Sequence, residues 1–236
     1  MRGRDNARSG GEILIDQLSI HGIRHAFCVP GESYLAALDA FYGSDIELTV
    51  CRHESTAAIM AEAVGKVTNW PGICFVTRGP GATNGSAGIH IARQDSSPMI
   101  MFVGQVGRDM RDREAFQELD YRAVFGTMAK WASEIDDPSR IPEIVSRAFH
   151  VACNGRPGPV VIALPEDMLR ERVSIGDATA FTPTETSPSA MTVPSRVSPT
   201  LSYRAITSRL FWSERRNRIP WPDGAGDSRM FTVVPA

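Results

Sequence analysis

The sequence lacks several features that define large classes of proteins. Its 236 residues contain no run of about 18 apolar residues, which a transmembrane helix would require. The polar, arginine-rich stretch 1–11 has no apolar segment of the kind that a secretory signal needs. Basic and acidic residues nearly balance, at 25 against 27, so nothing favours a nucleic acid or an anionic membrane as a partner. We therefore expect a cytoplasmic protein.

Lysine and cysteine are also scarce. Only Lys66 and Lys130 are lysines, and because arginine codons are GC-rich, this composition suggests a bacterial gene of high GC content. The four cysteines form no Cys-x-x-Cys pair and have no zinc-site spacing, so no metal site is predicted. Cys28, Cys51 and Cys74 lie in or beside apolar runs, where we expect buried, reduced thiols.

What the sequence does contain is a repeated alternation of short apolar segments with helical segments. Strands are expected at residues 24–29, 46–50, 73–77, 98–103 and 159–164. Helices are expected before Gly22 and at 33–42, 53–67, 82–92 and 138–152, with Leu35 among the inward-facing residues of the second. This order predicts an α/β fold with a doubly wound, mainly parallel sheet and helices on both faces.

Three loops are expected to meet at one edge of that sheet. They are Pro30-Gly31-Glu32, Arg52-His53-Glu54 and residues 78–84, and each follows an expected strand. Right-handed crossovers bring the carboxyl ends of parallel strands to the same edge, which is where open α/β sheets bind ligands.

The composition changes after about residue 177. We expect a disordered N-terminus over 1–10, a folded domain over 11–177 and an irregular C-terminal tail over 178–236. The tail is rich in proline, serine and threonine and has no useful helical or strand period. Its arginine-rich sequence with scattered tryptophans is typical of a shifted reading frame in a GC-rich gene, so we expect a frameshifted or truncated chain. A genuine disordered extension is the alternative.

The glycine loop Arg78-Gly79-Pro80-Gly81 joins an apolar strand to a helix. Its glycines permit close backbone approach, and the free amides at a helix start attract polar or anionic groups. Asn84 stands where a dinucleotide fingerprint needs glycine, and no Gly-Lys-Ser/Thr follows, so neither nucleotide motif is present. By itself the loop is equally well interpreted as a turn that the strand-to-helix geometry demands.

Glu54 stands between a strand that contains Leu48 and Val50, expected to be buried, and an alanine-rich helix. A carboxylate in the first turn of a helix is commonplace, because it complements the helix dipole. Its expected place beside the Pro30-Gly31 turn and the glycine loop adds a second interpretation, in which the carboxylate exchanges a proton with a bound ligand.

Six motifs occur in an order that resembles one enzyme family. They are Cys28-Val-Pro-Gly-Glu32, Arg52-His-Glu54, Val76-Thr-Arg-Gly-Pro-Gly-Ala-Thr-Asn84, Gly104-Gln105, Ala115-Phe-Gln-Glu118 and Arg156-Pro-Gly-Pro-Val-Val-Ile-Ala-Leu-Pro-Glu166. Together they resemble the N-terminal pyrimidine-binding domain of thiamine-diphosphate-dependent enzymes, in the acetolactate synthase branch. The resemblance covers roughly residues 10–171. One departure is Glu32, where the family usually has a second glycine.

The resemblance implies a role for each matching residue. Glu54 would be the catalytic glutamate that hydrogen-bonds a ring nitrogen of the cofactor's aminopyrimidine. The implied cofactor-binding residues are Pro30, Gly31, Glu54, Thr77, Pro80, Gly81, Asn84 and Gln117. Phe116 and Gln117 match a Phe-Gln pair near the substrate entrance, and Lys130 falls near a lysine beside the flavin or the substrate channel in some members.

The resemblance also implies what completes such an enzyme. In the family a separate C-terminal domain holds the diphosphate and magnesium, and a middle domain binds FAD in some members; neither is found in this sequence. We expect a homodimer, or pairing with a diphosphate-binding domain, and a 2-oxo acid substrate such as pyruvate. The isolated chain is then expected to bind thiamine diphosphate weakly and to consume no pyruvate.

Three alternatives stay open at this point. The full enzyme could be another thiamine-diphosphate decarboxylase or an acyltransferase, because the deciding pocket residues belong to other domains. The chain could instead be a non-catalytic fragment or partner subunit. A dinucleotide-binding module is disfavoured by the missing third glycine.

Overall fold

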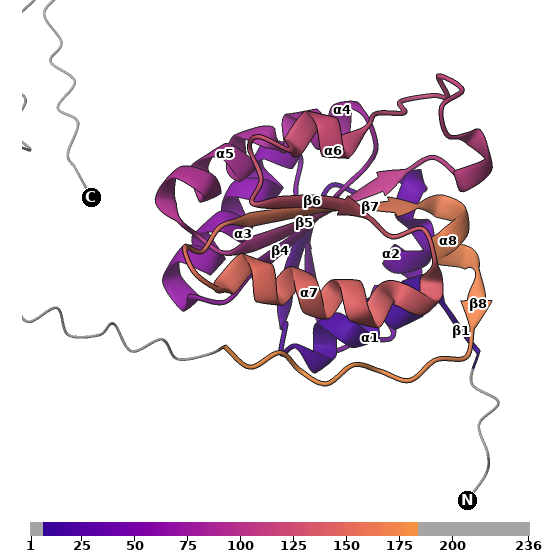
Figure 1. Ribbon diagram of the computed structural model, residues 1–236, viewed down its shortest axis with the longest axis horizontal. Coiled ribbons are helices and arrows are strands. Elements are labelled where there is room, and N and C mark those ends of the chain that lie inside the picture. Colours follow the sequence, from indigo (N-terminus) through magenta and orange to yellow (C-terminus); the bar gives the residue numbers. More distant parts are fainter. Residues whose placement is uncertain (1–6, 184–236) are drawn as a thin grey trace, which may run out of the picture. The chain divides into compact units, whose positions relative to one another are not determined.

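Six short apolar segments form a parallel sheet in the computed structural model, which describes residues 7–183 (Figure 1). The strands are β2 (His25–Cys28), β3 (Glu47–Val50), β4 (Gly72–Val76), β5 (Met99–Gln105), β6 (Trp131–Glu134) and β7 (Pro159–Pro165). Their order across the sheet is β3-β2-β4-β5-β7-β6, and every pair is parallel. The predicted α/β fold is confirmed.

Helices cover both faces of this sheet (Figure 1). One layer consists of α1 (Gly10–Ile20), α2 (Leu35–Tyr42), α7 (Ile141–Cys153) and α8 (Glu166–Arg170). The other consists of α3 (Glu54–Thr68), α4 (Pro80–Asn84), α5 (Ser86–Asp95) and α6 (Tyr121–Phe125). Within residues 7–183, none of the helices combines the length and the apolarity that crossing a membrane would require.

Burial on both faces explains why the central strands are apolar throughout. In β4, Ile73 and Phe75 pack into the core on the α1 side, whereas Cys74 and Val76 pack into the core on the α3 side. All four side chains are fully buried. Because successive strand residues point to opposite faces, a strand covered on both sides has no position for a polar side chain.

Small residues allow the helices α3 and α5 to pack closely. Ala57, Ala58 and Ala61 of α3 are buried, and so is Gly88 of α5. A Cβ atom placed on Gly88 would lie 2.5 Å from the Cβ atom of Ala58, which is inside van der Waals contact. This stripe of small residues is therefore used inside the domain.

Several details differ from the prediction. Leu35 was expected to face inward, but it is 61% exposed, because the short 3-10 turn Glu32–Tyr34 precedes α2 and puts Tyr34 into the core instead. Val50 was expected to be buried and is 63% exposed, because β3 is an edge strand with a neighbour on one side only. Cys51, just beyond it, is half-buried, whereas Cys28 and Cys74 are buried as expected.

Several helix and strand boundaries also differ from the predicted ones. The segment expected as one helix over 82–92 is two helices, α4 and α5, which meet at Gly85. The short helices α6 and α8 were not predicted, because five residues carry too little helical periodicity, and β6 was not predicted, because Trp-Ala-Ser-Glu is not an apolar run.

The two ends of the described chain lie together. Strand β1 (Arg8–Ser9) pairs with β8 (Arg172–Val173) in an antiparallel ribbon, and α1 begins at Gly10. Ordered elements thus start ahead of residue 11, the boundary that the sequence suggested. Farther on, Phe181 stacks on Trp70. The frameshift prediction for the tail falls mainly on residues 184–236, which lie outside the described residues, as do residues 1–6.

Candidate functional site

The loops that follow β2 and β4 diverge at the carboxyl edge of the sheet. Strand β2 lies between β3 and β4, so the chain proceeds from β2 to one side and from β4 to the other. Such a reversal of direction opens a crevice above the strand ends, the usual ligand position in open α/β sheets. Pro30 and Gly31 lie on one side of it, and the glycine loop lies on the other.

The glycine loop has a backbone shape that only glycine adopts easily. Gly79 has φ 58° and ψ −114°, a combination that a Cβ atom disfavours. Its N–H donates a hydrogen bond of 2.8 Å to the hydroxyl of Tyr121, the first residue of α6. Burial raises the pKa of that hydroxyl to about 12, so Tyr121 remains protonated and its oxygen accepts this bond near neutral pH.

Glu54 is the first residue of α3 and points into the crevice region from the β3 side. His53 caps the helix by accepting a hydrogen bond from the backbone N–H of Ser55, which is a structural role. The amide nitrogen of Asn84 donates to Glu54 Oε2 at 3.0 Å. Glu54 Oε1 has no hydrogen-bond partner among the described residues, and the carboxylate is half-exposed.

Thr77 lies between the two glycine turns, which contain Gly31 and Gly81. A Cβ atom on Gly31 would lie 2.5 Å from Thr77 Cβ, and one on Gly81 would lie 2.7 Å from Thr77 Cγ2. The same atom on Gly81 would lie 3.5 Å from Glu54 Oε1. Thr77 is itself oriented by a 2.9 Å hydrogen bond between its hydroxyl and that of Ser33. The two glycines thus allow both turns to approach Thr77 closely, with Glu54 Oε1 near Gly81.

The loop 107–120, which follows β5, reaches the other side of the glycine loop. Phe116 is 71% exposed at its tip, and Gln117 packs so closely on Gly79 that a Cβ atom there would lie 2.7 Å from Gln117 Cβ. Glu118 closes the loop by accepting hydrogen bonds from the N–H groups of Asp112 (2.6 Å) and Ala115 (3.0 Å), which lower its pKa.

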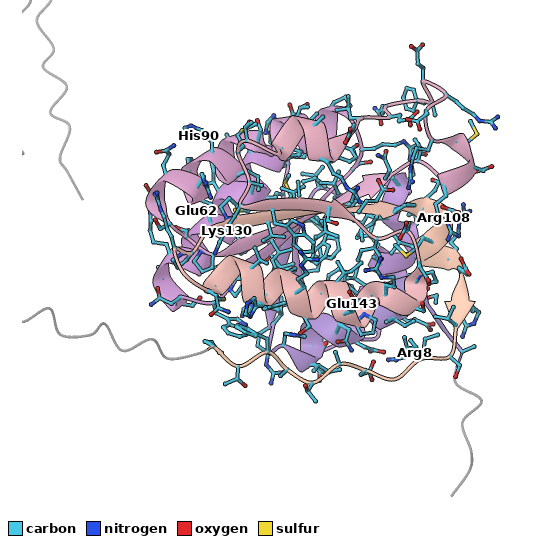
Figure 2. The ribbon with its side chains drawn as sticks, viewed as in Figure 1. Arg8, Glu62, His90, Arg108, Lys130 and Glu143 are labelled. Atoms are coloured by element: carbon cyan, nitrogen blue, oxygen red, sulfur yellow. The ribbon has the colours of Figure 1, made fainter. Side chains whose placement is uncertain are left out.

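Lys130 does not join this group. It precedes β6 at the amino edge of the sheet, where its backbone N–H donates to the carbonyl of Pro159 and its ammonium to that of Asn154. Figure 2 shows Lys130 near the end of the sheet that is opposite to Arg108. Burial lowers the pKa of Lys130. The structure therefore separates Lys130 from the other nine predicted site residues, which all lie at the carboxyl edge.

Sequence reasoning passed over Arg78 as a site residue, although it lies inside the glycine motif. Arg78 is only 8% exposed, and its side chain contacts Glu32, Glu166 and the backbone of Phe116. The available signal was Glu32, a carboxylate that stands in the neighbouring loop where the family usually has a second glycine.

These observations define a class of protein: a doubly wound α/β domain with a carboxylate beside two glycine turns at its switch point. The comparisons with known proteins narrow that class. Residues 8–124 match the family described as thiamine pyrophosphate enzyme, N-terminal TPP binding domain. The chain belongs to this family.

Relatives carry the name acetolactate synthase. The protein of Bacillus subtilis (strain 168) is 35% identical over 181 residues, which is 77% of this chain and 32% of the relative. The mitochondrial protein of Schizosaccharomyces pombe is 39% identical over 162 residues, 68% of this chain and 24% of the relative. A probable large subunit from Methanocaldococcus jannaschii is 40% identical, with 70% and 28% covered. The chain thus spans a quarter to a third of these relatives.

The residues at the carboxyl edge fit the pyrimidine end of thiamine diphosphate. An aminopyrimidine is flat and presents ring nitrogens, so a carboxyl group with a free oxygen beside exposed glycine turns suits it. A side chain larger than hydrogen on Gly31 or Gly81 would collide with Thr77, so both turns need glycine. Glu54 Oε1 is the oxygen left free beside Gly81, since Oε2 is held by Asn84.

Proposed function

We propose that this domain supplies the pyrimidine-binding half of a thiamine-diphosphate site, with Glu54 as its catalytic residue. The observation that carries the proposal is the carboxylate of Glu54, which has one oxygen held by Asn84 and the other free beside Gly81 of the glycine loop. The remaining cofactor contacts in this proposal are Pro30, Gly31, Thr77, Pro80, Gly81 and Gln117.

Each residue has a separate task in this proposal. When bound, thiamine diphosphate supplies the electron sink for decarboxylating a 2-oxo acid. Glu54 holds or moves a proton at a ring nitrogen of the pyrimidine, a positioned acid–base step of the kind that contributes a rate factor of about 10²–10⁴. Asn84 fixes the orientation of the carboxylate, and Thr77 supports the two glycine turns that contain Gly31 and Gly81.

The substrate proposal rests on the exposed loop. Phe116 and Gln117 lie beside the glycine loop and would line the entrance for a 2-oxo acid such as pyruvate, in a reaction of the acetolactate synthase type. Because Glu54, Pro80 and Asn84 are open to solvent on one side, we propose that a second copy or a diphosphate-binding domain covers them and holds the diphosphate and magnesium. The free thiols of Cys28, Cys51, Cys74 and Cys153 support a reducing, cytoplasmic location.

Titration with thiamine diphosphate, followed by amide chemical shifts, tests the proposal on this chain. Weak binding still moves resonances, so we expect concentration-dependent shifts at Gly31, Thr77 and Gly81. Glu54→Gln should abolish them, because a neutral amide cannot take the proton-sharing role of the carboxylate. Glu47→Gln is the matched control, since Glu47 begins the neighbouring strand β3 at the opposite edge. Shifts that are absent, or unchanged in Glu54→Gln, would refute the assignment.

A further inference from the structure

Arg78 is nearly buried, yet no carboxylate is buried with it. Its Nη2 donates to Glu32 Oε1 at 2.7 Å, and its Nη1 lies 3.6 Å from Glu166 Oε2. Both glutamate side chains are substantially exposed. Nη1 is shielded from solvent and has no hydrogen-bond partner within residues 7–183. Burying a guanidinium under such conditions costs free energy, which calls for a compensating role.

The remaining contacts of Arg78 show what it holds. Its Nε donates to the carbonyl oxygen of Phe116 at 3.1 Å, and the guanidinium carbon lies 6.0 Å from the centre of the Phe116 ring. One side chain from the end of β4 therefore joins the turn after β2, through Glu32, to the loop after β5, through Phe116.

On one side of Arg78 lies a hollow of about 370 Å³, lined by charged residues such as Glu32, Glu166 and Arg170 and by apolar residues such as Leu35 and Leu169. Packing therefore does little to fix the guanidinium on that side, and its position depends on directed hydrogen bonds. Those bonds fix the carbonyl of Phe116 directly and fix the ring through the short, closed loop.

Glu32 gives this arrangement a sequence signature. The turn after Pro30 usually has a second glycine in the resembling family, whereas here Glu32 stands in its place and pairs with Arg78 across 46 residues of chain. We propose that Arg78 is a positioning residue, which together with Glu32 fixes the loop 107–120 and the ring of Phe116 against the glycine loop. The consequence for substrate entry, which would pass Phe116, rests on the proposed function.

Amide hydrogen exchange on the cofactor-free chain tests the positioning role directly. The informative amides are those of Asp112, Ala115 and Glu118, which are hydrogen-bonded inside the loop. Arg78→Met keeps the length of the side chain but removes its donors, so we expect these amides to exchange about tenfold faster or more. The amides of β5 should keep their protection. A uniform increase over loop and sheet, or no change, would overturn the inference.

Three further variants sharpen the result. Arg170→Met is the matched control, because Arg170 lines the same hollow and pairs with Glu166 without touching Phe116. Its loop exchange should equal that of the unmodified chain. Arg78→Lys keeps the positive charge and provides a second test in case the Arg78→Met variant does not fold. One ammonium cannot replace the guanidinium fork, so exchange should increase by an intermediate factor, and wild-type exchange in Arg78→Lys would overturn the inference. Glu32→Gly should also speed loop exchange, by less than Arg78→Met.

The cofactor titration separates this inference from the proposed function. If the loop responds to Arg78→Met while thiamine diphosphate shifts no resonance, the positioning role stands and the cofactor assignment fails. If thiamine diphosphate shifts Gly31 and Gly81 but loop exchange is the same in all the variants, the cofactor assignment stands and the positioning role fails.

Discussion

At the amino edge of the sheet several polar side chains hold helix ends and turns together, whereas at the carboxyl edge Glu54 keeps one oxygen free. At the amino edge Arg156 donates to Ser96 Oγ and to the last carbonyls of α5, and Lys130 donates to Asn154. Buried Glu62 accepts a 2.6 Å bond from Ser97 and lies 3.3 Å from the ammonium of Lys66. These contacts satisfy helix ends and turns within the domain.

The carboxyl edge has the opposite character. Glu54 keeps one oxygen without a partner among the described residues, and Phe116 exposes most of its ring. Pro30, Pro80 and Asn84 are exposed around them. The difference teaches that polar residues near a sheet are not equivalent: Arg156 and Lys130 support turns at the amino edge, whereas Glu54 has a free oxygen at the edge where open α/β sheets bind ligands.

The largest expected effect is on enzyme activity, and it distinguishes the carboxyl edge of the sheet from the amino edge. In an active enzyme that contains this domain, Glu54→Gln should lower turnover about a hundredfold or more, because a proton-transfer partner is lost. Lys130→Gln should change turnover by less than about twofold, since Lys130 lies at the other edge. Initial rates of pyruvate consumption measure both. Near-normal turnover in Glu54→Gln, or a large loss in Lys130→Gln, would erase the distinction between the edges.

A second prediction concerns the stability of the carboxyl-edge loops. Gly79→Ala should cost about 1–3 kcal/mol of unfolding free energy, because alanine is strained at φ 58° and its Cβ would meet Gln117. Gly43→Ala is the control, since Gly43 has φ −93° and open space around it. That variant should be neutral or more stable by up to about 1 kcal/mol. Equal urea midpoints for the two variants would contradict the prediction.

The smallest expected effect is a pH dependence at the carboxyl edge. Burial alone would raise the pKa of Asp167, but hydrogen bonds from Arg108 Nε (2.7 Å) and Arg108 N (3.0 Å) outweigh it and lower the pKa. A lowered folded pKa gives stability that is present above the unfolded value of about 3.9 and is lost as the pH falls through the folded value.

Urea unfolding from neutral pH down to about pH 2 checks that sign, since the acid titration lies below an ordinary pKa of about 3.9. Asp167→Asn should be slightly less stable than the unmodified chain at pH 7, and the two should converge as the pH falls below about 4. Asp39→Asn, at an exposed position on α2, is the control and should track the unmodified chain. A gap that widens toward acid would reverse the assigned sign.

The sequence by itself determined the fold class and the edge of the sheet at which most of the predicted site residues lie. Apolar segments such as β4 and residues 99–104 of β5 have no polar side chain, as expected for a sheet covered on both faces. Because each strand was followed by its own loop, the order of motifs was enough to bring Pro30, Glu54 and Gly81 to one edge. These inferences needed only local periodicity and the common direction of parallel strands.

Tertiary structure alone decided the contacts between those loops. Arg78 meets Glu32 and Phe116 across 46 and 38 residues of chain, and no local pattern specifies such a pairing. The edge on which Lys130 lies could not be derived from the sequence, because the edge strand β6 reads Trp-Ala-Ser-Glu and lacks the apolar run that marks the other strands. The local sequence pattern indicates which side chains are buried and in which direction the strands run. Which polar side chains pair depends on the loops that the crossovers bring together in space.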